Sequence, residues 1–366
     1  MKRIFMGLLL SVLSFGANAA GNITHAIMTD EARKNVVLED LISLLDGHKQ
    51  YWLIGSALPD GGYIHNYSYA EPAHWPAFHV PYFKHINALC QGQLETTRCE
   101  QLIAHFLGMV AHGFEDESYD ILMNDRSELV DPPEVHSLLE GRDTMIDKYS
   151  VWDYNRAFHL MPSAVSPLDD VFQVFGAMRT RNVELSHLQI GEATMISAAS
   201  LQRNIVDFFT NYVDSQKYPW LRKSYITEAG GVEFTGRALA NLWEFYWEKF
   251  HGRIKAADVT VYPPDDGLIK SNRYDPWGRL TFLSDRPLQS SSLWSNFYLE
   301  DVSRNQKVSG SVRVRNGYVV TFNPRVSLVV GQRYRATLTT GIKDYWGNPV
   351  FSENFQWEVV VSDAEN

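Results

Sequence analysis

The stretch HGFEDESYD places three side chains that can bind metal at intervals of four residues: His112, Asp116 and Asp120. Residues at this interval lie on one face of an α-helix. Two carboxylates so close repel each other unless a positive charge lies between them, and imidazole with carboxylate is a suitable donor set for a divalent metal ion. A solvated helix face is the simpler interpretation of an isolated HxxxD motif, because Glu115 and Glu117 are charged too.

More histidines and carboxylates occur in order along the chain. His136 and Glu140 repeat the interval of four residues, and three candidates lie nearer the N-terminus: His25, Asp60 and His74. Zinc accepts imidazole nitrogen and carboxylate oxygen, and a catalytic zinc keeps one position open for water or substrate. Several such ions a few ångströms apart can stabilise both the attacking and the leaving oxygen of a phosphoryl transfer. The whole set favours a site for several metal ions.

Five ordered motifs resemble the zinc-dependent phospholipase C family. They resemble even more closely the catalytic domain of glycosylphosphatidylinositol-specific phospholipase D, which belongs to the same superfamily. The motifs are THAI, GSALPDGGY, EPAHWPAF, LIAHFLGMVAHGFED and HSLLEGRD, and they cover roughly residues 20 to 160. The resemblance implies a phosphodiesterase site with up to three metal ions, usually zinc.

The resemblance also implies a role for each residue. The ligands would be Asp60, His74, His112 and Asp116 for one ion, His136 and Glu140 for a second, and His25 with bridging Asp116 and the mature N-terminal residue Ala20 for a third. Asp60 is also the candidate base for the attacking water. The family usually has a second histidine shortly after the HxxxD motif, where this chain has Asp120. We include Asp120 as a ligand. Because it offers oxygen donors, the identity of the second ion stays open: it is zinc or a harder metal such as manganese or iron.

The N-terminus has the features of a secretory signal. Lys2 and Arg3 precede an apolar stretch, and the small residues ANA at 17–19 form a cleavage site. No later apolar run is long enough to anchor the chain. We therefore expect a secreted or periplasmic protein, in which Cys90 and Cys99 form a disulfide.

Composition limits the partners. The chain has 366 residues, of which 45% are hydrophobic and 21% charged, as in an ordinary soluble protein with room for two domains. The net charge is −10. Removal of Lys2 and Arg3 would make it −12 (−10 − 2), which disfavours nucleic acid as a partner.

The periodicity predicts an all-α domain followed by an all-β domain. Helical spacing runs from Thr29, an expected N-cap, to Gly252, and Pro59 is expected to end a helix just before Asp60. Alternating segments with turn signals such as RNG at 315–317 follow. PPDDG and LVVGQRYRATLTTGIKDYWGN resemble bacterial Ig-like modules. The predicted domains are a signal peptide at 1–19, a helical catalytic domain at 20–255 and an Ig-like β-sandwich at 263–366.

These observations predict an exported zinc-dependent phospholipase C that acts on phosphatidylcholine-like lipids at a membrane surface, as a monomer and without nucleic acid. Three alternatives stay open. A phospholipase D would cleave the other P–O bond, and a single-strand nuclease would use a similar trimetal site. A non-catalytic adhesion or binding protein would keep the metal ions for structure and work through its Ig-like domain.

Overall fold

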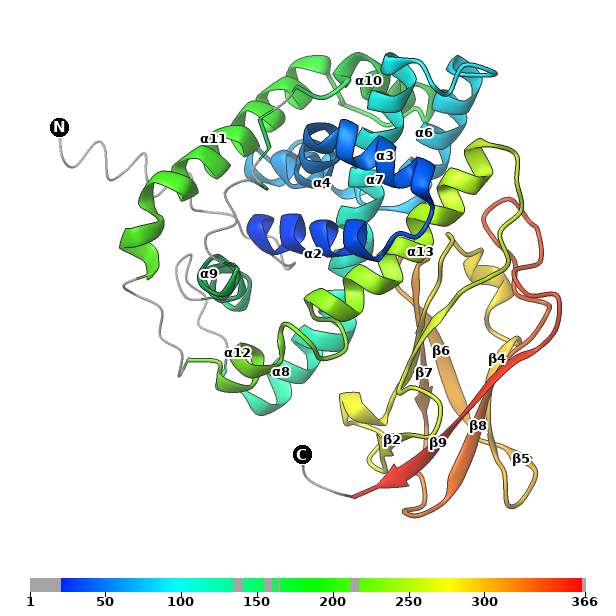
Figure 1. Ribbon diagram of the computed structural model, residues 1–366. Coiled ribbons are helices and arrows are strands. Elements are labelled where there is room, and N and C mark those ends of the chain that lie inside the picture. Colours follow the sequence, from blue (N-terminus) through cyan, green and yellow to red (C-terminus); the bar gives the residue numbers. More distant parts are fainter. Residues whose placement is uncertain are drawn as a thin grey trace. The chain divides into compact units, whose positions relative to one another are not determined.

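The computed structural model describes residues 21–133, 141–154, 160, 162–163, 165–210 and 217–363, with no side-chain description for 201–210. The predicted signal peptide and three predicted ligands lie outside these residues: Ala20, His136 and Glu140. The chain divides into two compact units, the first ending at Ala240 and the second beginning at Asn241 (Figure 1). Among the described residues, no helix has the length and apolar character needed to cross a membrane.

The first unit is helical, as predicted. Its helices are α2 (Asn22–Asn35), α3 (Glu39–Gly47), α4 (Lys49–Ile64), α5 (Ala70–Ala73), α6 (Pro76–Leu89), α7 (Thr97–Ser118), the π-helical turn η1 (Tyr119–Asn124), α8 (Asp125–Val130), α9 (Arg142–Asp153), α10 (Leu168–Ala177), α11 (Leu185–Thr210), α12 (Pro219–Ser224) and α13 (Val232–Phe250). Helix α13 continues from the first unit into the second.

Helices α4 and α7 pack with their backbones in close approach. A Cβ atom on Gly108 of α7 would lie 2.1 Å from the carbonyl oxygen of Trp52, and one on Gly55 of α4 would lie 2.3 Å from that of His105. No real Cβ atom tolerates such distances, so glycine is required at both positions. This contact holds α4 beside the helix that carries the HxxxD motif.

Pro59 does not end its helix, which corrects the sequence-based expectation. Helix α4 runs through Pro59 to Ile64. An interior proline costs a helix about 3 kcal/mol or more, because it removes one hydrogen bond and crowds the preceding turn. Burial of large side chains such as Trp52 and Leu58, each contributing about 1.5–3 kcal/mol, offsets that cost. Tertiary packing therefore keeps Asp60 on a helix.

Thr29 is not an N-cap. Helix α2 already begins at Asn22, and Thr29 is buried inside it. Its single hydroxyl hydrogen is shared between the carbonyl oxygen of His25 (2.8 Å) and Oε1 of Glu115 (2.8 Å). A threonine hydroxyl can bond to the carbonyl one turn earlier, so threonine fits within a helix as well as at its start.

The predicted disulfide is confirmed. Cys90 follows the last residue of α6, Cys99 lies in the first turn of α7, and their sulfur atoms are bonded. The bond closes the loop between these two helices, one of which carries His112.

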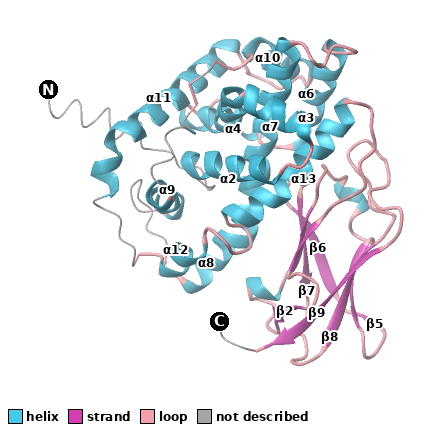
Figure 2. Ribbon diagram, viewed as in Figure 1, coloured by secondary structure: helices cyan, strands magenta, loops and turns pink. Residues whose placement is uncertain are grey.

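The second unit contains two β-sheets, drawn in magenta in Figure 2, as predicted. Its strands are β1 (Thr260–Tyr262), β2 (Gly267–Lys270), β3 (Leu280–Leu283), β4 (Phe297–Asp301), β5 (Gln306–Lys307), β6 (Gly310–Val314), β7 (Val319–Pro324), β8 (Arg333–Leu338) and β9 (Phe355–Ser362). The sheet orders are β1-β3-β7-β6 and β2-β9-β8-β4-β5. The pairs are antiparallel except β2 with β9. The RNG sequence connects β6 to β7, and Phe282, Phe297 and Trp357 lie in the shared core.

The C-terminal part of α13 packs within the second unit. The rings of Phe245 and Trp346 lie 6.0 Å apart, and the hydroxyls of Tyr246 and Tyr318 lie 3.4 Å apart. The unit that contains the sheets thus begins at Asn241, whereas the predicted division lies between residues 255 and 263.

Candidate metal centre

Five predicted ligands from four segments meet inside the first unit. His25 lies in the first turn of α2, Asp60 on α4, His74 directly after α5, and His112 and Asp116 one turn apart on α7. All five are buried, and Asp60, at 8% exposed, is the most accessible. Their ligand atoms form two overlapping groups of three, in each of which all atoms lie within 4.8 Å of one another.

His74 and His112 direct their Nε2 atoms at each other. Nδ1 of His74 lies 2.7 Å from the carbonyl oxygen of Ala70, and Nδ1 of His112 lies 2.6 Å from that of Ser56. A carbonyl oxygen only accepts, so both Nδ1 atoms carry the proton and both neutral rings have a lone pair on Nε2. These Nε2 atoms are 3.0 Å apart. A positive charge, either a proton or a metal cation, must lie between them.

Asp60 and Asp116 complete a compact set of four donors. Oδ1 of Asp60 lies 3.4 Å from Nε2 of His74 and 3.3 Å from Nε2 of His112. Oδ2 of Asp116 lies 3.6 and 3.5 Å from the same two nitrogen atoms. Zinc bonds of about 2.0–2.2 Å in a tetrahedron separate the ligand atoms by about 3.3–3.6 Å. The four distances from the carboxylate oxygens to the two nitrogen atoms match this spacing, and the 3.0 Å distance between the nitrogen atoms is shorter.

His25 forms a second set of donors with the other oxygen of Asp116. Nε2 of His25 lies 3.1 Å from Oδ1 of Asp116, whose Oδ2 faces the first set. The rings of His25 and His112 stack with centroids 4.2 Å apart. Asp116 thus presents one oxygen to each set, which is the arrangement of a bridging carboxylate.

Glu115 holds the far side of His25, and our sequence analysis did not identify it as part of the site. Its Oε2 lies 2.7 Å from Nδ1 of His25, and its Oε1 accepts from the Thr29 hydroxyl. A carboxylate on the second nitrogen of a histidine fixes the ring and strengthens it as a ligand. Glu115 is fully buried, and so is Glu117, which contradicts the alternative of a solvated helix face. The charge-free apolar run before Glu115 could have signalled a helix with no solvated side.

The pKa shifts follow from burial and from the opposing charges. Burial alone would lower the pKa of His25, but the charge of Asp116 and the hydrogen bonds of Asp116 and Glu115 raise it well above its usual value. For His74, burial also lowers the pKa, and the carboxylates of Asp60 and Asp116 outweigh this to raise it. For Asp60, burial raises the pKa, but the neighbouring histidines lower it overall.

A glycine beside His112 makes room for His74. A Cβ atom on Gly113 would lie 1.7 Å from the carbonyl oxygen of His74. Any other residue would push the segment after α5 away from α7. In the sequence HG at 112–113, His112 therefore supplies a metal-binding imidazole and Gly113 leaves the space in which His74 approaches it.

Asp120, the last predicted ligand among the described residues, lies outside these donor sets. It lies in the π-helical turn after α7. His105 is a buried core histidine whose Nδ1 lies 3.1 Å from the hydroxyl of Tyr82, and burial lowers its pKa to about 3.

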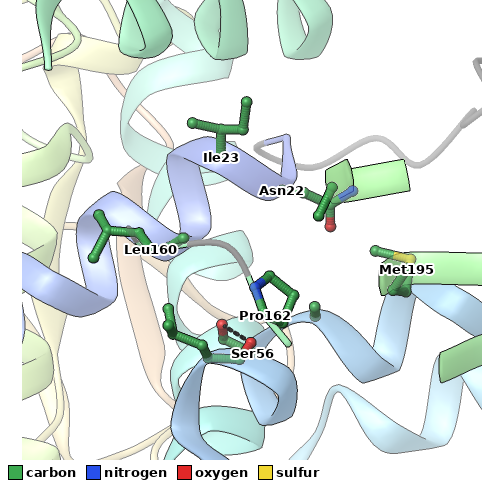
Figure 3. Close-up of a pocket in the computed structure, with 10 residues that line it drawn as sticks. Asn22, Ile23, Ser56, Leu160, Pro162 and Met195 are labelled. Atoms are coloured by element: carbon green, nitrogen blue, oxygen red, sulfur yellow. Dashed lines mark hydrogen bonds between the residues drawn. The ribbon is translucent and has the colours of Figure 1, made fainter. Parts of the chain in front are cut away.

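A small apolar pocket of about 20 Å³ lies next to Ser56 (Figure 3). Its walls come from α2, α4 and α11 and include Ile23, Ser56 and Met195. Ser56 connects the pocket with the donor sets, because its carbonyl oxygen accepts from His112.

Comparison with protein families identifies one part of the chain. Residues 258–359 match the family described as bacterial Ig-like domain. The second unit carries a bacterial Ig-like domain. The predicted C-terminal resemblance is thereby confirmed, and this match does not extend to the helical unit that holds the donor sets. No curated protein matches the sequence.

Solved structures of the surface-layer protein SbsC are similar to parts of the chain at 12% identity. Domains 1–6 of SbsC align with a TM-score of 0.25 over 79% of this chain and 46% of that one. The N-terminal part of SbsC aligns with a TM-score of 0.24 over 78% of each chain. The chain spans about half the length of the six-domain SbsC structure. Similarity at this level carries no argument about function.

Proposed function

We propose that the helical unit is a metal-dependent phosphodiesterase that hydrolyses phosphatidylcholine-like phospholipids as a phospholipase C. The observation that carries the proposal is the pair of facing Nε2 atoms of His74 and His112, whose Nδ1 atoms both donate to backbone carbonyls. Buried lone pairs 3.0 Å apart fit a site that binds a cation.

The donor set fits zinc in number and chemistry. Asp60, His74, His112 and Asp116 would hold one ion, and His25 with Asp116 would contribute to a neighbouring one. His25 Nε2 and Asp116 Oδ1 are buried, lie 3.1 Å apart and face no other partner among the described residues, which supports a ligand role for both atoms. Zinc bound there would neutralise phosphoryl oxygen charge and lower the pKa of a water molecule.

The roles of the protein's own residues follow from their contacts. The carbonyl oxygens of Ala70 and Ser56 keep both imidazole rings in the tautomer that binds metal. The lowered pKa of Asp60 keeps this carboxylate charged at neutral pH. A strongly acidic carboxyl group is a good ligand but a weak base, so the ligand role of Asp60 has better support than its proposed role as the base.

The choice of a lipid rests on the resemblance of the five motifs to zinc-dependent phospholipases C. Attack of water on phosphorus would release diacylglycerol and a phosphorylated head group. The reaction would take place at a membrane surface after export to the periplasm or the medium, by a monomer. The sites for up to three ions would be completed by His136, Glu140 and the mature N-terminus at Ala20. With Asp120 as a ligand, the identity of the second ion stays open between zinc and a harder metal.

A second candidate is a non-catalytic adhesion or binding protein that keeps the metal for structure. The match of residues 258–359 to bacterial Ig-like domains supports it, because this match is independent of the metal centre. Under this alternative the metal-loaded protein would bind its partner through the Ig-like domain and would turn over no lipid.

The test is a mass-spectrometric assay of the purified, zinc-loaded protein on phosphatidylcholine, with His112→Ala as the matched inactive variant. Phosphocholine and diacylglycerol, absent with the variant, are the expected products. Choline with phosphatidic acid would show phospholipase D cleavage instead. No release at full zinc occupancy would overturn the phosphodiesterase proposal and leave the adhesion alternative.

A further inference from the structure

Helix α2 begins without a cap of its own. Its N-cap residue, Gly21, has no side chain to accept from the first-turn amides, and the structure shows no side-chain cap there. Unsatisfied amide groups make a helix start prone to fraying. His25 lies in this first turn, and its own amide makes the first bond to the carbonyl oxygen of Gly21 (3.0 Å).

A carboxylate from a distant helix supplies the missing acceptor. Oδ1 of Asp147, on α9, accepts from the backbone amide of Thr24 (2.9 Å) and from its hydroxyl (2.8 Å). Thr24 is the third residue of α2, which is the position whose amide a local N-cap side chain ordinarily satisfies. The hydroxyl of Ser150, one turn further along α9, lies 3.1 Å from that of Thr24. A negative charge at this end also suits the helix dipole.

The absence of a side chain on Gly21 makes this contact possible. A Cβ atom at residue 21 would lie 2.2 Å from Cγ of Asp147. The chain therefore passes directly over the carboxylate, and only glycine leaves room for it. Gly21 has no side chain that could cap α2, and for the same reason it leaves space for the carboxylate of Asp147 to cap the helix.

We propose that Asp147 is a positioning residue that caps α2 from α9 and thereby holds His25 in the metal centre. Glu115 orients the imidazole ring, but the backbone of His25 is set by the first turn of the helix. The consequence for metal binding rests on the function proposed above. The cap itself does not, because it consists of bonds between Asp147 and Thr24.

The test uses the full-length protein after metal removal with a chelator. Hydrogen exchange of the peptide that covers residues 22–29 reports the first turn, and carbethoxylation of His25, followed by mass spectrometry, reports exposure of its ring. In Asp147→Ala we expect both rates to rise by about five- to tenfold, the effect of losing a helix cap. Asp147→Asn keeps an oxygen at the same position and should restore most of the protection.

Asp153→Ala is the matched control. It removes a carboxylate from the same helix, but that carboxylate bonds to Arg222 and Tyr225 and not to α2. It should leave both rates in the 22–29 peptide at the wild-type level. Wild-type rates in folded Asp147→Ala would overturn the proposal, and so would equal increases in Asp147→Ala and Asp153→Ala.

If Asp147→Ala does not fold, Gly21→Ala tests whether Asp147 holds the first turn of α2. The added methyl group displaces the carboxylate without removing it, so exchange and labelling should rise in the same two places. Unchanged rates in that variant would show that Asp147 does not hold α2. Zinc content, measured separately on all variants, distinguishes the two proposals. A wild-type protein that binds no zinc would refute the proposed function, whereas the labelling result would still decide the role of Asp147.

Discussion

Nε2 of His74 lies 3.0 Å from Nε2 of His112, and the Nδ1–H group of each ring donates to a backbone carbonyl oxygen. The two rings come from segments separated by 38 residues in sequence and meet because Gly113 lets the chain after α5 approach α7. A buried pair of this kind is unfavourable without a proton or a metal cation between the rings, and the oxygens of Asp60 and Asp116 lie where they would complete the coordination of a metal.

Removal of His112 should abolish metal binding at this pair. We expect His112→Ala to lose at least one zinc ion per chain and nearly all hydrolytic activity, because one donor of the set is missing. His105→Gln is the control, since His105 lies on the same helix but bonds to Tyr82 outside the donor sets. Metal content by atomic emission and helicity by circular dichroism are the measurements. A zinc content in His112→Ala equal to that of the control would contradict the ligand assignment.

Glu115→Gln should weaken metal binding without removing a ligand. The variant keeps the size of the side chain but replaces the charged acceptor of His25 with a neutral one. Loss of such a partner typically costs 10- to 100-fold in metal affinity or activity. Competition with a chromogenic chelator measures the affinity, and Glu128→Gln, at the surface on α8, serves as the control. Equal affinities in the two variants would show that Glu115 only fills space.

The stability of the chelator-treated protein should fall as pH rises above neutrality. The folded-state pKa of His25 is raised above its ordinary value near 6.5, so folding is accompanied by proton uptake. Protonation of His25 therefore contributes to the free energy of unfolding. This contribution is fully present below the unfolded-state pKa and is lost as pH rises through the folded-state pKa. His74 acts in the same direction. Zinc needs the neutral rings, so the zinc-loaded protein should become more stable over the same interval. Urea unfolding between pH 6 and pH 9 measures how the free energy of unfolding changes with pH in the chelator-treated and the zinc-loaded protein. The same pH dependence in both forms would contradict the prediction.

The disulfide should stabilise the fold without contributing to the site. A loop this short gives about 2–3 kcal/mol when closed. The double variant Cys90→Ser, Cys99→Ser should therefore lose about that free energy of unfolding and keep its zinc. Denaturant unfolding and metal analysis measure the two quantities. A large loss of zinc in a folded double variant would show that the loop between α6 and α7 supports the metal centre.

Truncation after residue 262 should preserve the metal centre but reduce solubility. The deletion uncovers the part of α13 that packs inside the second unit, including Phe245 and the buried Tyr246. Exposed aromatic patches promote association. We expect aggregation that Phe245→Ser with Tyr246→Ser relieves, at unchanged zinc content. Size-exclusion chromatography with metal analysis is the measurement, and a soluble truncated protein without zinc would place part of the site in the deleted region.

Local sequence patterns determined much of this protein. The change from helical to alternating periodicity predicted a helical unit followed by a β-sheet unit, because each pattern reflects the repeat of its own element. The expected export of a chain with two cysteines predicted the bond between Cys90 and Cys99. The motifs also named the five side chains that the structure gathers: His112 and Asp116 by their helical interval, and His25, Asp60 and His74 through the resemblance of their motifs to a phospholipase family.

Tertiary structure alone decided how those side chains are held. The partner of His25 lies 90 residues away at Glu115, and the cap of α2 lies 123 residues away from Thr24 at Asp147. Neither pairing leaves a trace in local periodicity, which reports only neighbours within a turn or two. The same limit explains Pro59, where packing against other helices outweighs a local signal to stop. Short-range patterns indicate which residues face inward, and the packing of distant segments decides which of them meet.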